Sequence, residues 1–165
     1  MSEFKRPSFF VGCDIRKLSH ERGESDPYIG TVDAWPQHIT LLPPVEELDD
    51  QPPDDVFREF AEIAKRTAPF RVMPIRDAMF GEDGETEVTI VEDLKVLHFA
   101  LLGILHAYGY DGQYPEMYTG RRYSAHTSRG TGILPPADAI TLDSMSIFRK
   151  RNGKRYIQER LQFVR

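Results

Sequence analysis

The sequence predicts an α+β fold, in which short strands and two amphipathic helices alternate along a chain of 165 residues. Apolar and polar residues alternate over short segments bounded by proline and glycine, which is typical of half-buried strands. Two longer segments carry apolar residues at helical spacing. A chain of this length can bury a sizeable core, and no linker divides it. We therefore expect a single domain over residues 1–165.

The first strands are predicted near the N-terminus. Residues 8–14 (SFFVGCD) are rich in aromatic and β-branched types and predict a strand. A polar stretch containing glycine and proline follows and predicts a long loop. Residues 38–42 (HITLL) predict a second strand. We expect it to end at Pro43 and Pro44, because proline cannot donate a ladder hydrogen bond.

The first helix is predicted after Pro52, where the sequence PPDD is typical of a helix start. Apolar residues then recur at helical spacing until Pro69. Beyond this proline, residues 70–75 and residues 87–92 predict two strands. The sequence GEDG at 81–84 marks a turn region between them.

The strongest helical pattern spans residues 93–108, with leucines on one side and a glycine as its stop. A short strand is predicted over residues 123–128. Two longer strands, over 141–148 and 155–164, are joined by an Asn-Gly pair at 152–153, which indicates a hairpin. Each predicted helix is thus associated with strands of its own.

Two of the five histidines stand in the same short motif, His38-x-Thr40 and His126-x-Ser128. Side chains at i and i+2 of a strand share one face, so each motif presents an imidazole beside a hydroxyl. Imidazole exchanges protons near neutral pH, and a hydroxyl can donate to a phosphate oxygen. Two facing motifs would supply one base, one acid and two phosphate ligands. These four residues are the candidate catalytic set, in a scheme that requires no metal and no cofactor.

The stretches PQHITLLPP and YSAHTSRG carry a resemblance to a known family. They resemble the two motifs of the two-histidine (2H) phosphoesterases, also called LigT-like or 2′,5′ RNA ligase-like proteins. Arg129 stands where that family more often has an apolar residue. The resemblance implies a bilobal LigT-like α+β fold, with two pseudo-symmetric halves of antiparallel sheet and helices around a central groove.

The resemblance also implies a function. His38 and His126 would be the acid–base pair, and Thr40 and Ser128 would bind phosphate oxygens, in metal-free hydrolysis of a phosphodiester. Family members act on 2′,3′-cyclic phosphates, 1″,2″-cyclic ADP-ribose phosphates, 2′,5′ linkages or cyclic oligonucleotide signals, and the motifs do not separate these. The expected partner is a nucleotide or an RNA end.

Substrate binding would need stacking surfaces and positive charge near the motifs. Trp35 precedes the first motif, and Tyr118 and Tyr123 precede the second. These three are candidate base-binding residues, with ordinary packing as the alternative for each. Arg129 either adds a positive charge to the groove or points away into solvent.

Charge and composition limit the partners. The net charge of −5 argues against general affinity for duplex DNA. Residues 1–110 carry a balance of −10 and residues 111–165 one of +5, so the basic part contains the second motif. The segment RKRNGKR at 149–155 is either a solvated hairpin end or a cationic rim that attracts phosphate.

Membrane spans, signal peptides and cysteine pairs each have a recognisable pattern in a sequence. No apolar run approaches the roughly 18 to 20 residues of a membrane span, and the chain start lacks the features of a signal peptide. We expect a soluble, cytoplasmic protein. The single cysteine, Cys13, excludes an internal disulfide and lies in an apolar run, so we interpret it as a buried structural thiol.

Two other functions remain open. A binding module could keep the same groove and sequester a nucleotide or RNA end without turnover. A metal-dependent hydrolase could use His38 and His126 with Asp14 or Asp143, although the sequence shows no tight ligand cluster. Protein partners and oligomeric state are not predicted.

Overall fold

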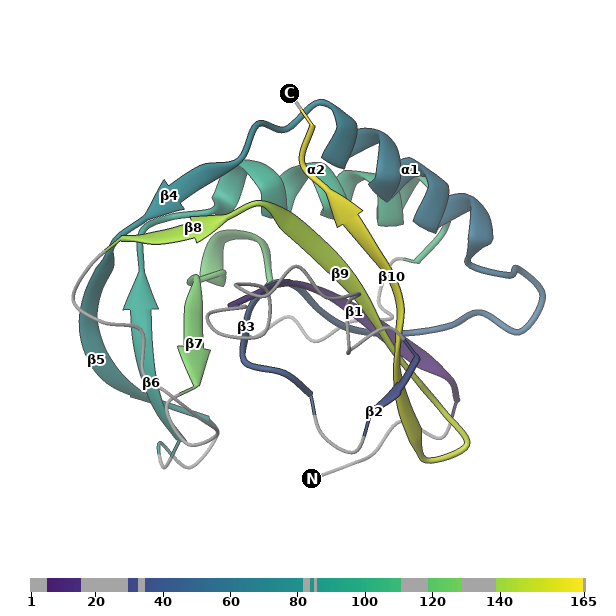
Figure 1. Ribbon diagram of the computed structural model, residues 1–165. Coiled ribbons are helices and arrows are strands. Elements are labelled where there is room, and N and C mark those ends of the chain that lie inside the picture. Colours follow the sequence, from purple (N-terminus) through teal and green to yellow (C-terminus); the bar gives the residue numbers. More distant parts are fainter. Residues whose placement is uncertain are drawn as a thin grey trace.

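The computed structural model describes residues 6–15, 30–32, 35–81, 84, 86–110, 119–128 and 139–164. These residues form antiparallel sheets with two α-helices (Figure 1), so the predicted α+β class is confirmed. Residues 16–29 of the predicted long loop lie outside the described residues, and the described part of that stretch contains a short strand, β2 (Gly30–Val32), before Trp35.

The largest sheet has four strands, and every pair of neighbours in it is antiparallel. The Asn-Gly pair forms the predicted hairpin turn, with positive φ at Asn152 (51°) and Gly153 (75°). The predicted strand at the N-terminus is confirmed with the expected bounds. Across the sheet the order is β10 (Lys154–Gln162), β9 (Ser144–Arg151), β1 (Ser8–Asp14) and β3 (His38–Glu46).

The prediction that the second strand ends at its prolines is wrong, because β3 continues through Pro43 and Pro44 to Glu46. Two features of β3 permit this. It is the edge strand of the sheet, so an N–H facing away from β1 has no ladder partner to lose. The register also shifts here, so that both prolines lie opposite a single β1 residue, Phe10. Such a bulge leaves one residue outside the ladder.

A second sheet has three strands, β5 (Pro74–Phe80), β6 (Thr86–Val91) and β7 (His126–Ser128). The strand predicted over 123–128 is therefore shorter than expected, because a 3₁₀ turn, η1 (Gly120–Arg122), and three residues without regular structure precede it.

A two-stranded ladder joins β4 (Phe70–Val72) to β8 (Ile140–Leu142). The strands predicted over 70–75 and 141–148 each divide in two, at Met73 and Asp143. Each stretch contributes to two sheets, so a continuous hydrophobic run in the sequence becomes two strands with a change of direction between them.

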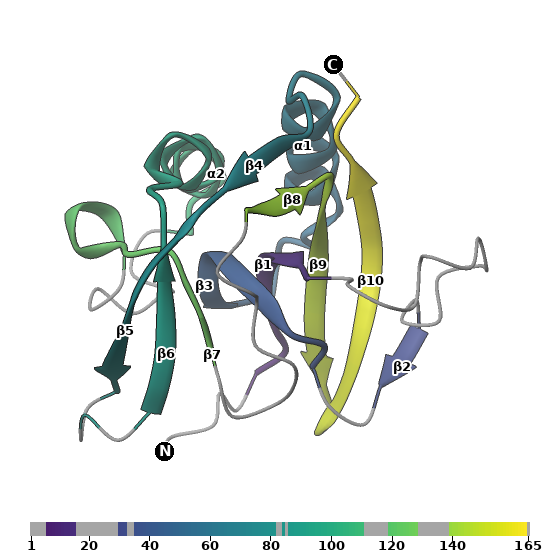
Figure 2. The same cartoon turned by 60° about the vertical axis from the view of Figure 1, so that its left-hand side comes forward.

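Both predicted helices are present, as α1 (Asp54–Lys65) and α2 (Lys95–Ala107). They lie on the same side of the molecule, above the sheets in Figure 1, and Figure 2 shows the same arrangement from another direction. Gly109 follows α2 with φ of 81°, a conformation that stops a helix at little cost for glycine. No helix among the described residues is long and apolar enough to cross a bilayer.

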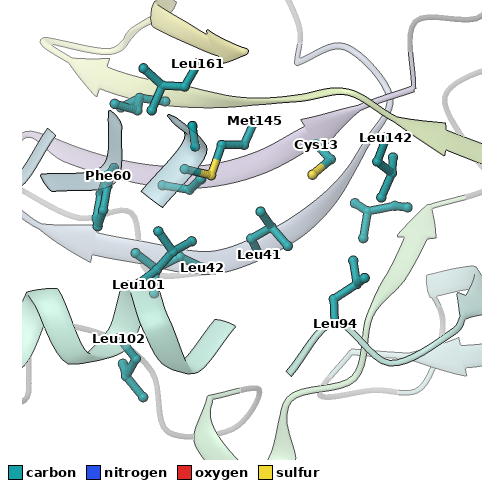
Figure 3. Close-up of a cluster of buried hydrophobic side chains, with 14 of the residues drawn as sticks. Cys13, Leu41, Leu42, Phe60, Leu94, Leu101, Leu102, Leu142, Met145 and Leu161 are labelled. Atoms are coloured by element: carbon teal, nitrogen blue, oxygen red, sulfur yellow. The ribbon is translucent and has the colours of Figure 1, made fainter. Parts of the chain in front are cut away.

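The main core lies between the four-stranded sheet and the two helices (Figure 3). Phe9 of β1 contacts Phe57 of α1 edge to face, with ring centroids 5.1 Å apart, and burying such a ring contributes about 1.5–3 kcal/mol. Cys13 is fully buried, as predicted, and burial raises its pKa. The opposite face of the same sheet carries a smaller cluster of Phe10, Phe148 and Ile157, with Val32 and Trp35 packed against it.

Candidate functional site

The two motif strands lie side by side, although they belong to different sheets. β3 begins at His38 and β7 begins at His126, and each is the edge strand of its own sheet. Both views show β7 between β6 and β3 (Figures 1 and 2). The side-chain amide of Gln37 donates to the hydroxyl of Thr127 at 3.4 Å, which links the two motifs directly. We call this pair of adjoining strands the motif seam.

His38 is supported by aromatic rings on the face of the sheet opposite the main core. Its ring centroid lies 5.2 Å from that of Phe10 and 5.2 Å from that of Phe148. Its Nδ1 lies 2.7 Å from the carbonyl oxygen of Pro36, two residues earlier in the chain. The ring is therefore held by packing on one side and by a hydrogen bond at one nitrogen.

His126 has a matching environment on the other side of the seam. Its ring packs edge to face on Phe80, with centroids 4.6 Å apart. Its Nδ1 lies 2.8 Å from the carbonyl oxygen of Ser124, again two residues earlier in the chain. The two histidines thus share one local arrangement, although they are 88 positions apart in the sequence.

This arrangement selects one tautomer for each neutral ring. A carbonyl oxygen only accepts hydrogen bonds, so Nδ1 must carry the proton and Nε2 carries the lone pair. The same device orients histidines that act at metal and acid–base sites, because fixing one nitrogen defines what the other can do. At both motifs, Nε2 is therefore the nitrogen that exchanges a proton.

Burial lowers the pKa of both imidazoles below 6.5. The hydrogen bonds to Pro36 and Ser124 oppose this effect by stabilising the protonated rings. For His38, the carboxylate of Asp14 also raises the pKa, whereas the charge of His126 lowers it. The last effect is a repulsion between like charges, so the pKa of His38 responds to the protonation state of His126.

Thr40 lies two residues after His38, on the same face of β3, and both side chains are partly buried. Ser128 lies two residues after His126 in β7, where its register partner is Val88. The structure thus brings three of the four candidate catalytic side chains to the motif seam and places the backbone of the fourth there.

Gly12 of β1 provides the space for the His38 ring. It pairs in register with Thr40, and a Cβ atom at this position would lie 3.1 Å from Cδ2 of His38 and 3.2 Å from Cε2 of Phe148. Such contacts are tighter than ordinary packing allows. The sequence reasoning missed this residue, and a glycine inside a strand pattern was the signal that could have found it.

The candidate substrate-binding residues differ in where the structure places them. Trp35 is partly buried and packs on Phe10 and Phe148, beside the His38 ring, with centroid distances of 5.2 and 5.5 Å. Tyr123 is only 5% exposed and stacks on His98, so we assign it a supporting role in place of the expected base-stacking one. Tyr118 and Arg129 lie outside the described residues.

The metal-dependent alternative requires Asp14 or Asp143 as a ligand beside the motif histidines. The fully buried carboxylate of Asp14 forms an ion pair with Arg160, which offsets the negative charge that would attract a cation. Asp143 is exposed, between β8 and β9. Within the described part of the chain, no group of three or more histidine, cysteine or acidic residues is placed to hold a metal ion.

Comparisons with known proteins show the fold. No protein-family model and no curated protein sequence matches the chain. TT0787 of Thermus thermophilus has a TM-score of 0.62 at 16% identity, with 94% of this chain and 97% of that chain covered. E. coli LigT complexed with 3′-AMP has a TM-score of 0.58 at 16% identity, covering 97% and 100%. A structure described as a phosphoesterase has a TM-score of 0.53 at 14% identity, covering 96% and 99%. These likenesses confirm the expected fold: the chain has the LigT-like fold over nearly its whole length.

Proposed function

We propose that this protein is a phosphodiesterase that hydrolyses a cyclic or 2′,5′-linked phosphodiester of a nucleotide or an RNA end by two-histidine acid–base catalysis. One observation supports this most strongly. The imidazoles of His38 and His126 are anchored in the same way on adjoining strands, each through Nδ1 to the carbonyl two residues before it. General acid–base catalysis needs two such groups, of which one is neutral and one protonated.

In the proposed reaction, Nε2 of one histidine takes a proton from the attacking water, whose oxygen forms a new bond to phosphorus. Nε2–H of the other histidine donates its proton to the departing ester oxygen as the bond from that oxygen to phosphorus breaks. The protons balance, because one ring gains what the other loses, and solvent exchange resets both. The hydroxyls of Thr40 and Ser128 donate to the non-bridging oxygens. Both proton-transfer groups come from the protein, so the scheme uses no metal.

The comparison structures support a nucleotide ligand. E. coli LigT structures are complexed with 3′-AMP, NADP+ and phosphate. This chain shares their fold and places its two motifs at one seam, so we infer a nucleotide or RNA-end substrate for it. Trp35, Tyr118 and Arg129 are the proposed contacts to the base and the flanking phosphate.

The test is turnover, in excess EDTA, of four compounds: a nucleoside 2′,3′-cyclic phosphate, a 2′,5′-linked dinucleotide, and a 2′,3′- and a 3′,3′-cyclic dinucleotide. Wild type is compared with His38→Asn and His126→Asn. The asparagine amide nitrogen lies roughly where Nδ1 of histidine lies, so these variants keep a donor for the carbonyl and lose Nε2. The matched control is His106→Asn, which replaces an exposed histidine near the end of α2.

We expect wild type and His106→Asn to cleave at least one compound, and both motif variants to lose nearly all turnover. Activity that EDTA abolishes would favour the metal-dependent alternative instead. Tight binding without cleavage, retained in the motif variants, would favour the binding module. Full activity of either motif variant would refute the two-histidine mechanism.

A further inference from the structure

His98 of α2 is a fully buried histidine that connects the two halves of the motif seam. Its Nδ1 lies 2.7 Å from the carbonyl oxygen of Leu41, the residue after Thr40 in β3. Its Nε2 accepts a hydrogen bond of 2.8 Å from the backbone N–H of Gly120, six residues before His126. Because one partner only accepts and the other only donates, the ring is neutral with its proton on Nδ1.

Tyr123 forms a second connection beside the first. Its ring stacks on His98 with a centroid distance of 4.1 Å and an interplanar angle of 2°. Its hydroxyl donates to the carbonyl oxygen of Thr40 at 2.8 Å. Burial raises the pKa of this phenol, so it remains a donor across the physiological range. Two successive carbonyls of the first motif strand are therefore bound by two stacked rings.

An irregularity in β3 makes the carbonyl of Leu41 available to His98. The register runs from Val11 opposite Leu42 to Gly12 opposite Thr40, so Leu41 is an extra residue in an edge strand. A bulge leaves the extra residue outside the ladder, and a buried carbonyl without a partner costs about 1–3 kcal/mol. Leu41 is fully buried, so the imidazole of His98 replaces a partner that neither the ladder nor water supplies.

The relative position of the motifs depends on side chains, because β3 and β7 belong to different sheets and share no backbone ladder. The link between Gln37 and Thr127 is long, at 3.4 Å. The contacts of His98 and Tyr123 are shorter, and they join β3 to the segment that leads directly into β7. They are therefore the stronger constraint on how far His38 lies from His126.

We propose that His98 and Tyr123 are positioning residues, which set the separation and orientation of His38 and His126 without touching the substrate. This inference rests on the proposed function for its effect on catalysis, but the separation itself can be measured without a substrate. Acid–base catalysis is sensitive to geometry, because a displacement of about 1 Å can cost on the order of 100-fold in rate. A residue that holds the seam together should therefore affect kcat more than KM.

Tyr123→Phe is the most specific variant, because it keeps the stacked ring and removes only the hydroxyl that donates to the carbonyl oxygen of Thr40. His98→Phe keeps an aromatic ring but removes both hydrogen bonds, and His98→Gln restores one donor and one acceptor. The matched control is Tyr108→Phe, at a partly buried tyrosine that packs against the main core at the end of α2. Thermal unfolding identifies any variant that fails to fold.

The first measurement is steady-state kinetics on the compound that wild type cleaves. We expect kcat of Tyr123→Phe to fall about tenfold or more with KM within about twofold. His98→Phe should lose more, His98→Gln should recover part of that loss, and Tyr108→Phe should match wild type. An unchanged kcat in both Tyr123→Phe and His98→Phe would overturn the proposal. Lack of turnover by wild type would instead count against the proposed function alone.

The deciding measurement is an NMR titration of the His38 imidazole, which needs no substrate. In wild type, replacing His126 by asparagine should raise the pKa of His38, because it removes the repulsion between the two rings. In the Tyr123→Phe background the same replacement should raise the pKa of His38 less, because the two rings are no longer held in their native relative position. An equal increase in both backgrounds would overturn the proposal, even if kcat falls.

Discussion

Asp14 and His38 are register partners at the adjoining ends of β1 and β3, and the carboxylate of Asp14 raises the pKa of the His38 imidazole. Asp14 is fully buried and forms an ion pair with Arg160 of β10, which also donates to the hydroxyl of Ser146 at 3.2 Å. The proton affinity of His38 therefore depends on a charged pair that joins β1 to β10 across the intervening strand β9.

Asp14→Asn should lower the pKa of His38 further below 6.5. The substitution removes the negative charge that stabilises the imidazolium, while the positive charge of Arg160 remains. The limb of the kcat/KM profile that reports His38 should therefore move to lower pH. An NMR titration of His38 in both proteins measures the shift directly, and an unchanged pKa would show that Asp14 does not control this residue.

A second buried ion pair provides the control for that variant. Glu47 accepts hydrogen bonds of 2.8 and 2.5 Å from Nε and Nη2 of Arg149, on the face of the sheet that packs against α1. Removing one partner of a buried pair costs about 3–5 kcal/mol. Glu47→Gln should therefore lower the free energy of unfolding by a similar amount to Asp14→Asn, yet leave the pKa of His38 unchanged.

Gly12→Ala should reduce kcat/KM by about 10- to 100-fold, because the added methyl group displaces the His38 ring or Phe148. Gly103→Ala is the matched control. It lies in α2, and a Cβ there meets no atom within 4 Å. Alanine should stabilise that helix by about 0.5–1 kcal/mol and leave kcat/KM unchanged. Steady-state kinetics and denaturant unfolding of both variants test this, and equal activity of the two would contradict it.

The sequence was sufficient to predict features that depend on local patterns. The helical spacing that ends before Pro69 and the alternation over 87–92 reflect contacts within a few residues, and both elements are confirmed. The two motifs were also found locally, since a spacing of two places an imidazole and a hydroxyl on one face of any strand.

Features that depend on the order of strands in a sheet could not be predicted in this way. Pro43 and Pro44 are tolerated because β3 is an edge strand with a bulge at these residues, and neither fact is visible in the residues themselves. His98 fits the apolar side of its helix, so its spacing predicts only packing. Its contact with the Leu41 carbonyl joins residues 57 positions apart and exists only because the register of β3 shifts there.

The pH profile of kcat/KM should be bell-shaped with its maximum below pH 6.5. The productive state has one histidine neutral and one protonated, and its population peaks midway between the two pKa values. Burial lowers the pKa of both His38 and His126 from 6.5, so that midpoint lies below 6.5. A phosphodiester keeps its charge through this range, so the profile reports the free enzyme. A maximum at pH 7 or above would contradict the assignment of these two residues.

The stability of the protein should fall as the pH is lowered below 6.5, and His98 should contribute to this loss. Its Nε2 accepts from the N–H of Gly120, so protonation would place two donors against each other, and burial lowers its pKa from 6.5. The unfolded chain then binds more protons than the folded one below pH 6.5, so the free energy of unfolding falls by up to about 1.4 kcal/mol per pH unit for each such histidine. Urea unfolding between pH 8 and 5 measures this slope. In His98→Gln the slope should be smaller by the contribution of about one bound proton. An identical slope in both proteins would show that His98 is protonated as readily in the folded state as in the unfolded chain.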